Sequence, residues 1–211
     1  MRRRDQGRPA APFSGRDDAR RQIAHGAARL IAEGLTDFHA AKRKAARQMG
    51  MADSRSLPDN HEIEAALREH FALFSPDRQP AALAALRVVA LELMTHLAEF
   101  GPWISGPVLT GTANEFSEIE LELVGVEPKV FELYLLNTAV EFEPVSMRPE
   151  KTENVPSPSR YRFEYQGAPI TIALFEHHAA RQAVYQTGSP HRDRAQYSEA
   201  DKLFSEAKSK L

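Results

Sequence analysis

Apolar residues recur at helical spacing in four segments of the first hundred residues, which predicts four helices in this part of the chain. We expect these helices at about residues 16–33, 37–48, 60–74 and 81–100. The segment at residues 51–60, MADSRSLPDN, contains turn residues and a proline, and therefore predicts a connection between the second helix and the third. The fourth segment has the strongest apolar stripe, and we expect it to form the central packing helix.

The period changes to two at residues 118–123, where the run EIELEL alternates three glutamates with three aliphatic residues. Successive side chains of a β-strand point to opposite faces, so this run predicts a strand with a buried aliphatic row and an acidic row on its other face. A helix is expected next at about 127–139, then strands at about 140–147, 160–166 and 170–175, and a terminal helix at about 198–208. This order predicts an α+β fold, in which N-terminal helices are followed by a small mixed sheet with flanking helices.

The chain divides into three predicted parts. Residues 1–15, MRRRDQGRPAAPFSG, combine arginines with prolines and glycines and show no apolar period, so we expect a disordered basic tail. Residues 16–78 are expected to form a helical N-terminal region, and residues 79–211 the α+β domain. A chain of 211 residues, 42% hydrophobic and 27% charged, is long enough and apolar enough for two packed parts.

Three features of the composition narrow the classes of function. The chain contains no cysteine, which excludes disulfides and thiolate chemistry and leaves only histidine and carboxylate ligands for zinc. It contains no apolar run of about 18 residues, and its basic N-terminus is not followed by the apolar segment of a signal peptide. We therefore expect a cytoplasmic protein without a membrane partner.

The net charge of −2 conceals an uneven distribution of charge along the chain. Residues 1–50 contain twelve arginines and lysines against five aspartates and glutamates, and the remainder is acidic. Such asymmetry indicates RNA or another polyanion as a partner, although a basic leader that contacts only solvent explains it equally well. In the second predicted helix Arg43, Lys44 and Arg47 point away from the apolar stripe, so this face could dock on phosphates. A solvated helix face is the alternative.

The acidic row at Glu118, Glu120 and Glu122 needs an explanation, because like charges on one strand face repel each other. Such charges are tolerated where they are solvated, protonated or neutralised by a cation, and Mg²⁺ takes carboxylate oxygens as ligands. Two interpretations remain open: a half-exposed strand with a solvated acidic face, and a strand that holds a metal.

The stretch at residues 106–123, GPVLTGTANEFSEIELEL, resembles the signature of the nucleotidyltransferase superfamily, which includes DNA polymerase beta. In that family a helix precedes a strand and a Gly-Ser turn, and a second strand carries two acids separated by one hydrophobic residue. Gly106 falls on the turn glycine and Gly111 on a second small residue of the loop. Glu118 and Glu120 fall on the two acids. The resemblance covers roughly residues 80–176 and implies a nucleotidyltransferase-like fold.

The resemblance implies a transferase that moves a nucleoside monophosphate from an NTP substrate to RNA, a protein or a small acceptor. Two Mg²⁺ ions held by paired carboxylates would neutralise charge on the attacking and leaving oxygens of this reaction. By the resemblance, Glu118 and Glu120 are the catalytic metal ligands. The resemblance also implies nucleotide binding at the glycine turn, which comprises Gly106, Pro107, Gly111 and Thr112.

Three departures from the family pattern open a second interpretation. Pro107 stands where the family has the turn serine, both acids are glutamates where the family usually has aspartates, and Thr171 stands in the expected place of a third acid. The alternative is a catalytically inactive nucleotidyltransferase-like protein, which binds nucleic acid or a protein partner through its basic N-terminal helices. The sequence therefore leaves two functions open, an enzyme and a binding protein.

Overall fold

The computed structural model describes residues 15–51, 57–145, 158–177 and 194–208. The chain forms two compact units, residues 1–66 and residues 67–211, which we call the N-terminal unit and the C-terminal unit. The division falls inside helix α3 (Asn60–Phe74), whereas the sequence-based division at residue 78 falls at the beginning of the next helix. The basic tail expected at residues 1–15 lies outside the described residues, except for Gly15.

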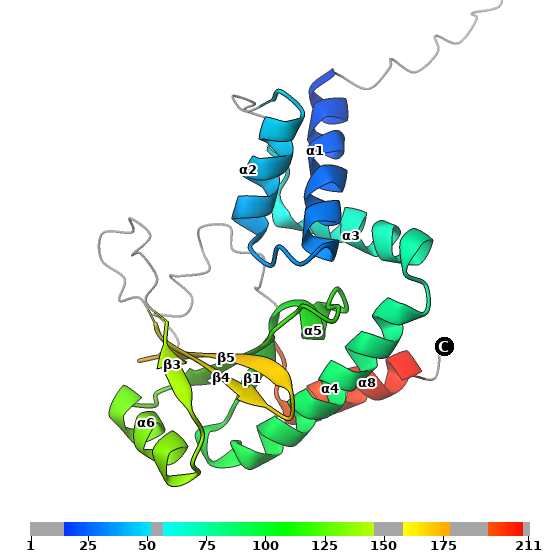
Figure 1. Cartoon of the computed structure of the whole chain (residues 1–211). Coiled ribbons are helices and arrows are strands. Elements are labelled where there is room, and N and C mark those ends of the chain that lie inside the picture. Colours follow the sequence, from blue (N-terminus) through cyan, green and yellow to red (C-terminus); the bar gives the residue numbers. More distant parts are fainter. Residues whose placement is uncertain (1–14, 52–56, 146–157, 178–193, 209–211) are drawn as a thin grey trace, which may run out of the picture. The chain divides into compact units, whose positions relative to one another are not determined.

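The C-terminal unit contains the sheet and the helices that pack against it (Figure 1). Its described helices are α4 (Arg78–His96), the 3₁₀ turn η1 (Ala98–Phe100), α5 (Gly106–Thr110), α6 (Pro128–Asn137) and α8 (Tyr197–Lys208). Its described strands are β1 (Trp103–Ser105), β2 (Ile119–Val124), β3 (Phe142–Pro144), β4 (Ser159–Tyr165) and β5 (Ala168–Phe175). These elements confirm the predicted α+β class.

The five strands form one sheet in the order β1-β2-β5-β4-β3. Strands β2 and β5 run parallel, and the other neighbouring pairs run antiparallel, so the sheet is mixed as predicted. In this register Glu120 lies opposite Ser105 of β1 on one side and opposite Thr171 of β5 on the other. The acidic strand is therefore an interior strand with a neighbour on each side.

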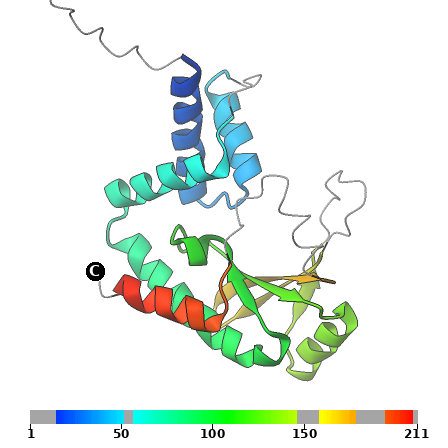
Figure 2. The ribbon, with the colours of Figure 1, turned by 180° about the vertical axis from the view of Figure 1, so that it is seen from behind.

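One face of the sheet is apolar and packs against α4, α6 and α8, so the unit has two layers (Figure 2). The aliphatic residues of β2 and β5 are buried on this face, among them Ile119, Leu121 and Ile170. Tyr161 of β4 reaches the same layer, where its hydroxyl donates a hydrogen bond to Glu132 Oε1 of α6 at 2.7 Å. Burial, together with this hydrogen bond, raises the pKa of Tyr161 to about 12. None of the helices among the described residues is long and apolar enough to cross a membrane.

The N-terminal unit consists of α1 (Gly15–Ala32), α2 (Phe38–Gln48) and the beginning of α3. These helices confirm the elements predicted at residues 16–33, 37–48 and 60–74. A Cβ atom on Gly26 of α1 would lie only 3.1 Å from Ala45 Cβ of α2, so small residues allow these two helices to pack closely. The buried apolar residues of this unit are Ile23, Ala24, Ala27, Ala28, Leu30, Ile31, Ala41, Ala45, Ala46, Ile63 and Ala66.

Helix α3 begins with a capping box. Asp59 Oδ1 accepts a hydrogen bond from the Glu62 backbone N–H at 2.9 Å, and Glu62 Oε2 accepts one from the Asp59 backbone N–H at 2.7 Å. Arg20 of α1 donates from Nε to Glu62 Oε2 at 2.6 Å, and this hydrogen bond is the main reason that the pKa of Arg20 is raised. The Arg20 and Glu62 side chains are 38% and 41% exposed. Their ion pair therefore contributes less to the free energy of unfolding than the capping hydrogen bonds do.

Lys42 of α2 is buried, although its neighbours Arg43 and Lys44 are exposed. Its Nζ atom donates hydrogen bonds to Pro58 O at 3.0 Å and to Asn60 Oδ1 at 2.8 Å. Burial lowers the pKa of Lys42, and the two acceptors offset part of the lost hydration. The side chain therefore joins α2 to the beginning of α3.

We expect Lys42→Met to lower the free energy of unfolding by about 1–3 kcal/mol, because Pro58 O and Asn60 Oδ1 lose their donor inside the unit. Lys44→Met, at an exposed position of the same helix, is the matched control and is expected to change the stability by less than about 0.5 kcal/mol. Urea unfolding followed by circular dichroism measures both variants. Equal losses for the two variants would contradict the buried role of Lys42.

Candidate functional site

The acidic row lies on the face of the sheet opposite the apolar layer. Glu118 precedes β2, and Glu120 and Glu122 lie within it, while the intervening aliphatic residues are buried on the other face. The predicted alternation is therefore confirmed. The carboxylates do not share one environment, because the Glu118 side chain is 22% exposed and the Glu122 side chain is 1% exposed. The interpretation of a solvated acidic face does not apply to Glu122.

Gly106 lies directly against the carboxylate of Glu120. Strand β1 pairs with β2 so that Ser105 lies opposite Glu120, and Gly106 follows with a φ of +71°. A Cβ atom on Gly106 would lie 2.6 Å from Glu120 Cδ and 2.8 Å from both carboxylate oxygens. The backbone conformation and this contact both favour glycine at this position. The structure thus brings together the turn glycine and the second acid of the predicted site.

Gly106 is the first residue of the short helix α5. Pro107 occupies its first turn, where the missing N–H removes no helical hydrogen bond. The Pro107 carbonyl oxygen accepts hydrogen bonds from the backbone N–H groups of Gly111 and Thr112, each at 3.0 Å. Gly111 ends the helix with a φ of +83°, and the Thr112 side chain is buried, with its Oγ1 atom 3.0 Å from Thr110 Oγ1. Gly111 and Thr112 belong to the predicted nucleotide site, and in the structure their backbone N–H groups are engaged within the loop.

The loop that leads to Glu118 is held in place by buried hydrogen bonds. Ser117 Oγ accepts a hydrogen bond from the Asn114 backbone N–H at 3.0 Å and donates one to Asn114 Oδ1 at 3.1 Å. Gln79 of α4 donates from Nε2 to Ala113 O at 2.7 Å. Because Asn114, Ser117 and Gln79 are all buried, these contacts fix the backbone from which the Glu118 side chain projects. No pattern in the sequence predicted these supporting residues.

Glu118 is engaged by two side chains, one from the adjacent strand β5 and one from β4 beyond it. Thr171 of β5 donates from Oγ1 to Glu118 Oε2 at 2.5 Å, and Arg162 Nη2 of β4 lies 2.8 Å from Glu118 Oε1. The sheet register explains this arrangement, because Thr171 lies opposite both Glu120 and Arg162, and their side chains share one face. Thr171 therefore lies beside the acids, in the place expected for a third acid, and Arg162 supplies a positive charge there.

Arg162 is a further site residue that the sequence pattern did not predict. The strand SRYRFEY alternates charged residues with Tyr161 and Phe163, which are buried in the apolar layer. This alternation was a signal that Arg162 lies on the polar face of the sheet. Its position next to Glu118 follows from the strand order, which the alternation does not specify.

Glu122 is the most buried of the three acids and faces a second arginine. Arg194 Nη1 lies 3.9 Å from Glu122 Oε2, and the Arg194 guanidinium lies 3.9 Å from the centroid of the Trp103 ring. Trp103 is the register partner of Glu122 in β1. A buried carboxylate is unfavourable without a compensating charge or hydrogen bonds, and Arg194 provides such a charge.

The side chains around Glu118 differ from the carboxylate clamp that two Mg²⁺ ions require. Both Glu118 oxygens are in contact with protein donors, and Thr171 contributes a hydroxyl where a third carboxylate would serve. Within the described ranges, no group of three or more histidine, aspartate or glutamate side chains is placed to hold a metal ion. The Mg²⁺ site at Glu118 and Glu120 stays a prediction, as does the nucleotide site at Gly106, Pro107, Gly111 and Thr112.

The basic residues predicted to bind nucleic acid form an exposed face of α2. Arg43, Lys44 and Arg47 are exposed, and Ala41 and Ala45 are buried. The sequence of α2 contains no acidic residue, so no carboxylate of the same helix offsets these charges. Arginine and lysine side chains on one helix face can contact neighbouring phosphates.

Comparison of the chain with protein-family models, with curated proteins and with solved structures found no significant match. The relationship to nucleotidyltransferases is therefore a prediction based on residues 106–123 and on the order of the elements. The catalytic, cofactor and nucleic-acid roles of the site residues are predictions of the same kind.

We expect Gly106→Ala to destabilise the C-terminal unit more than Gly125→Ala does. Both glycines have positive φ angles, +71° and +78°, so alanine is strained at each by about 1 kcal/mol or more. Only at Gly106 does the new Cβ atom also meet Glu120, since no described atom lies within 4 Å of a Cβ at Gly125. Thermal unfolding of the two variants measures the difference.

The double variant Gly106→Ala/Glu120→Ala separates the two causes of strain. Gly106→Ala is expected to lose more stability than Gly125→Ala. Removal of the Glu120 carboxylate is expected to restore this additional loss of stability. If Gly106→Ala has the same effect with and without Glu120, the contact between these residues contributes nothing.

Proposed function

We propose that this chain is a nucleotidyltransferase-like protein that has no transferase activity and binds nucleic acid through helix α2. The observation that carries the proposal is the engagement of Glu118 by Arg162 and Thr171. In a metal-dependent transferase this carboxylate would be available to a cation. Here an arginine of the same unit provides the cation.

Two features support the relationship to nucleotidyltransferases. The elements from α4 to β2 follow the order that the resemblance implies, which is helix, strand, glycine turn and acidic strand. The turn glycine, Gly106, packs against the second acid of the pair, Glu120. Neither feature requires chemistry at the acids, so the fold is compatible with an inactive protein.

The charge around the acidic strand supports the loss of catalysis. A divalent cation at Glu118 would have to displace the Arg162 guanidinium or lie close to it, and like charges repel. Displacement of Arg162 would still leave Thr171 as a neutral ligand in place of an acid. Hard divalent cations bind most strongly where several carboxylates converge. Beside Glu118 one such position is occupied by the hydroxyl of Thr171, so this site provides fewer carboxylates than a metal clamp requires.

The exposed face of α2 supports nucleic acid as the partner. Arg43 and Arg47 carry guanidinium groups, which bind phosphate oxygens with two parallel hydrogen bonds, and Lys44 adds a third charge. The basic excess in residues 1–50 adds a longer-range attraction to a polyanion. An acidic protein surface is the other partner that these charges would attract, and the binding experiment below distinguishes the two.

A Mg²⁺-dependent nucleotidyltransferase is the second candidate, and the placement of Glu118 and Glu120 on one strand face favours it. Side chains two residues apart on a strand point to the same side, as paired metal ligands must. The Arg162 side chain is 51% exposed, so it has room to turn away from Glu118. In this case Glu118 and Glu120 would hold the metal, and Gly106 would lie beside the phosphates of the NTP.

The first test measures nucleotide transfer. We expect no transfer of label from α-labelled ATP, GTP, CTP or UTP to RNA or to the protein itself in the presence of Mg²⁺. The same nucleotides with Mg²⁺ are expected to leave the midpoint of thermal unfolding unchanged, because a ligand that binds the native state would raise it. Transfer that is abolished in Glu118→Ala/Glu120→Ala would establish the second candidate instead.

A pair of variants tests whether Arg162 and Thr171 prevent Mg²⁺ from binding at Glu118. We expect Arg162→Ala/Thr171→Asp to be stabilised by millimolar Mg²⁺, with a midpoint shift on the order of a few degrees, because a cation is removed and a third carboxylate is added. Arg162→Lys/Thr171→Ser keeps the charge and the hydroxyl, and is the matched control without an expected response to Mg²⁺. Equal responses of the two variants would show that these side chains do not determine metal binding.

The nucleic-acid partner is tested by the salt dependence of binding. We expect the protein to bind fluorescein-labelled single-stranded RNA with an affinity that falls steeply as the salt concentration rises, as measured by fluorescence anisotropy. Arg43→Gln/Lys44→Gln/Arg47→Gln is expected to weaken this binding. It is also expected to reduce the slope of log affinity against log salt concentration by about 2, because three phosphate contacts are lost.

The matched control removes three exposed cations of the C-terminal unit, Arg78, Lys129 and Lys202, and therefore has the same net charge as the α2 variant. This control is expected to keep the wild-type slope. An equal loss of RNA affinity in the control, or no binding of RNA by the wild type at low salt, would contradict the assignment of the RNA-binding surface to α2. Binding of polyglutamate without binding of RNA would indicate an acidic protein as the partner.

A further inference from the structure

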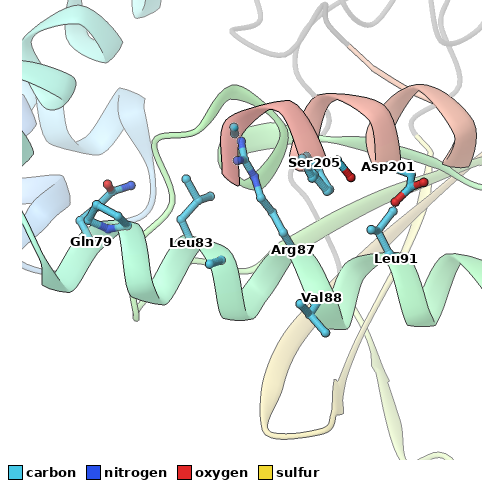
Figure 3. Close-up of a pocket in the computed structure, with 11 residues that line it drawn as sticks. Gln79, Leu83, Arg87, Val88, Leu91, Asp201 and Ser205 are labelled. Atoms are coloured by element: carbon cyan, nitrogen blue, oxygen red, sulfur yellow. The ribbon is translucent and has the colours of Figure 1, made fainter. Parts of the chain in front are cut away.

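Helices α4 and α8 line a cavity in the C-terminal unit that is partly open to solvent (Figure 3). Its volume is about 400 Å³, which lies in the range of small-molecule sites in proteins. The cavity belongs to the helical layer, whereas the acidic row lies on the other face of the sheet. The proposed function makes no use of this cavity.

The α4 side of the cavity is largely apolar. Leu83 and Leu91 line the cavity and are half-buried against the core that contains Leu93 and Met94, and Val88 extends this apolar wall toward solvent. Val88 is 52% exposed. A helix at the surface of a protein usually presents a polar outer side to water, and this helix does not do so along the cavity. The wall therefore favours a ligand with an apolar body.

Arg87 brings a cation into this apolar wall. Its guanidinium carbon lies 4.5 Å from the centroid of the Phe204 ring of α8, and its Nε atom donates a hydrogen bond to Val108 O at 3.2 Å. Burial lowers the pKa of Arg87, because the guanidinium is partly removed from water. In the part of the chain that the structure describes, no carboxylate lies within ion-pair distance of Arg87. An arginine stays protonated at neutral pH, so the cavity contains a positive charge with further donors besides Nε.

The acidic residue that lines the cavity limits the charge of a ligand. Asp201 of α8 lies at the end of the cavity near Leu91, as Figure 3 shows, and is not paired with Arg87. A ligand with a single negative charge next to Arg87 can keep that charge away from Asp201. A ligand with negative charges at both ends would bring one of them toward the carboxylate, where like charges repel.

We propose that this cavity binds a small amphipathic monoanion, whose carboxylate pairs with Arg87 and whose apolar body packs on Leu83, Val88 and Leu91. Medium-chain fatty acids represent this class of ligand. The apolar body removes from water the exposed side chain of Val88 and the exposed parts of Leu83 and Leu91. The carboxylate accepts charge-assisted hydrogen bonds from the guanidinium donors, which compensates the charge of Arg87 within the wall.

Isothermal titration calorimetry of the full chain with decanoate and with decanamide tests this proposal. The two compounds have the same apolar chain, and only decanoate carries a charge. We expect one decanoate to bind per chain with an affinity about tenfold higher than that of decanamide, because pairing with a charged group contributes roughly this factor. Equal affinities, or no binding of decanoate below the concentration at which it forms micelles, would overturn the proposal.

Variants locate the binding in the cavity. Val88→Glu places a negative charge in the wall at an exposed position and is expected to weaken decanoate binding by about tenfold or more. Val130→Glu is the matched control, because Val130 is also 52% exposed but belongs to α6 and does not line the described cavity. It is expected to bind decanoate as the wild type does. Unchanged binding in Val88→Glu, or an equal loss in Val130→Glu, would place the ligand elsewhere and refute the site.

The charge of Arg87 is tested by substitution at that position. Arg87→Gln is expected to bind decanoate and decanamide with equal affinity, whereas Arg87→Lys is expected to keep the preference for decanoate. A preference for decanoate that persists in a folded Arg87→Gln would refute the pairing. If Arg87→Gln does not fold, because its contacts with Val108 and Phe204 are lost, the comparison of the two compounds on the wild type decides the role of charge.

Discussion

Like-charge repulsion along one strand face is the constraint on which the C-terminal unit depends. The acidic row would resist burial in a sheet, yet β2 lies in the interior of the strand order and Glu122 is buried. Arg162 faces Glu118 and Arg194 faces Glu122, and both arginines come from segments far along the chain from β2. The register of β2, β5 and β4 therefore brings Arg162 to Glu118, and the bridge between Ile104 of β1 and Ala195 holds Arg194 near Glu122.

Local sequence patterns predicted most of the helices and strands. The features that they did not predict are mostly contacts between residues that are distant in the sequence. The alternation in EIELEL placed the acids on one face, and the helical spacing located α1 to α4, because both periods are properties of neighbouring residues. Arg162 was missed because its neighbours across the sheet depend on the strand order. Lys42 belongs to a basic run that is typical of a surface, and its burial depends on acceptors at Pro58 and Asn60.

The sequence predicted which residues form the candidate site better than it predicted the contacts that these residues make. The glycine and strand signals placed Gly106 in a turn and Glu118 and Glu120 at the acidic strand, and the strand pairing then brings Gly106 against Glu120 and Thr171 against Glu118. The engagement of the loop donors by the Pro107 carbonyl depends on how α5 closes, which no residue type specifies. The two candidate functions, enzyme and binding protein, are consequently compatible with the same fold. They differ in whether Glu118 pairs with Arg162 or binds a metal ion.

The strands that carry Arg162 and Thr171 also suggest an order of folding. β4 and β5 are antiparallel and are joined at Gln166 and Gly167, which both have positive φ, as a tight hairpin turn requires. Such a hairpin forms through local contacts, whereas the parallel pairing of β2 with β5 closes a long loop and is slower. We therefore expect the hairpin to form first, so that Arg162 and Thr171 are already in place when the acidic strand pairs with β5 and its carboxylates are removed from water.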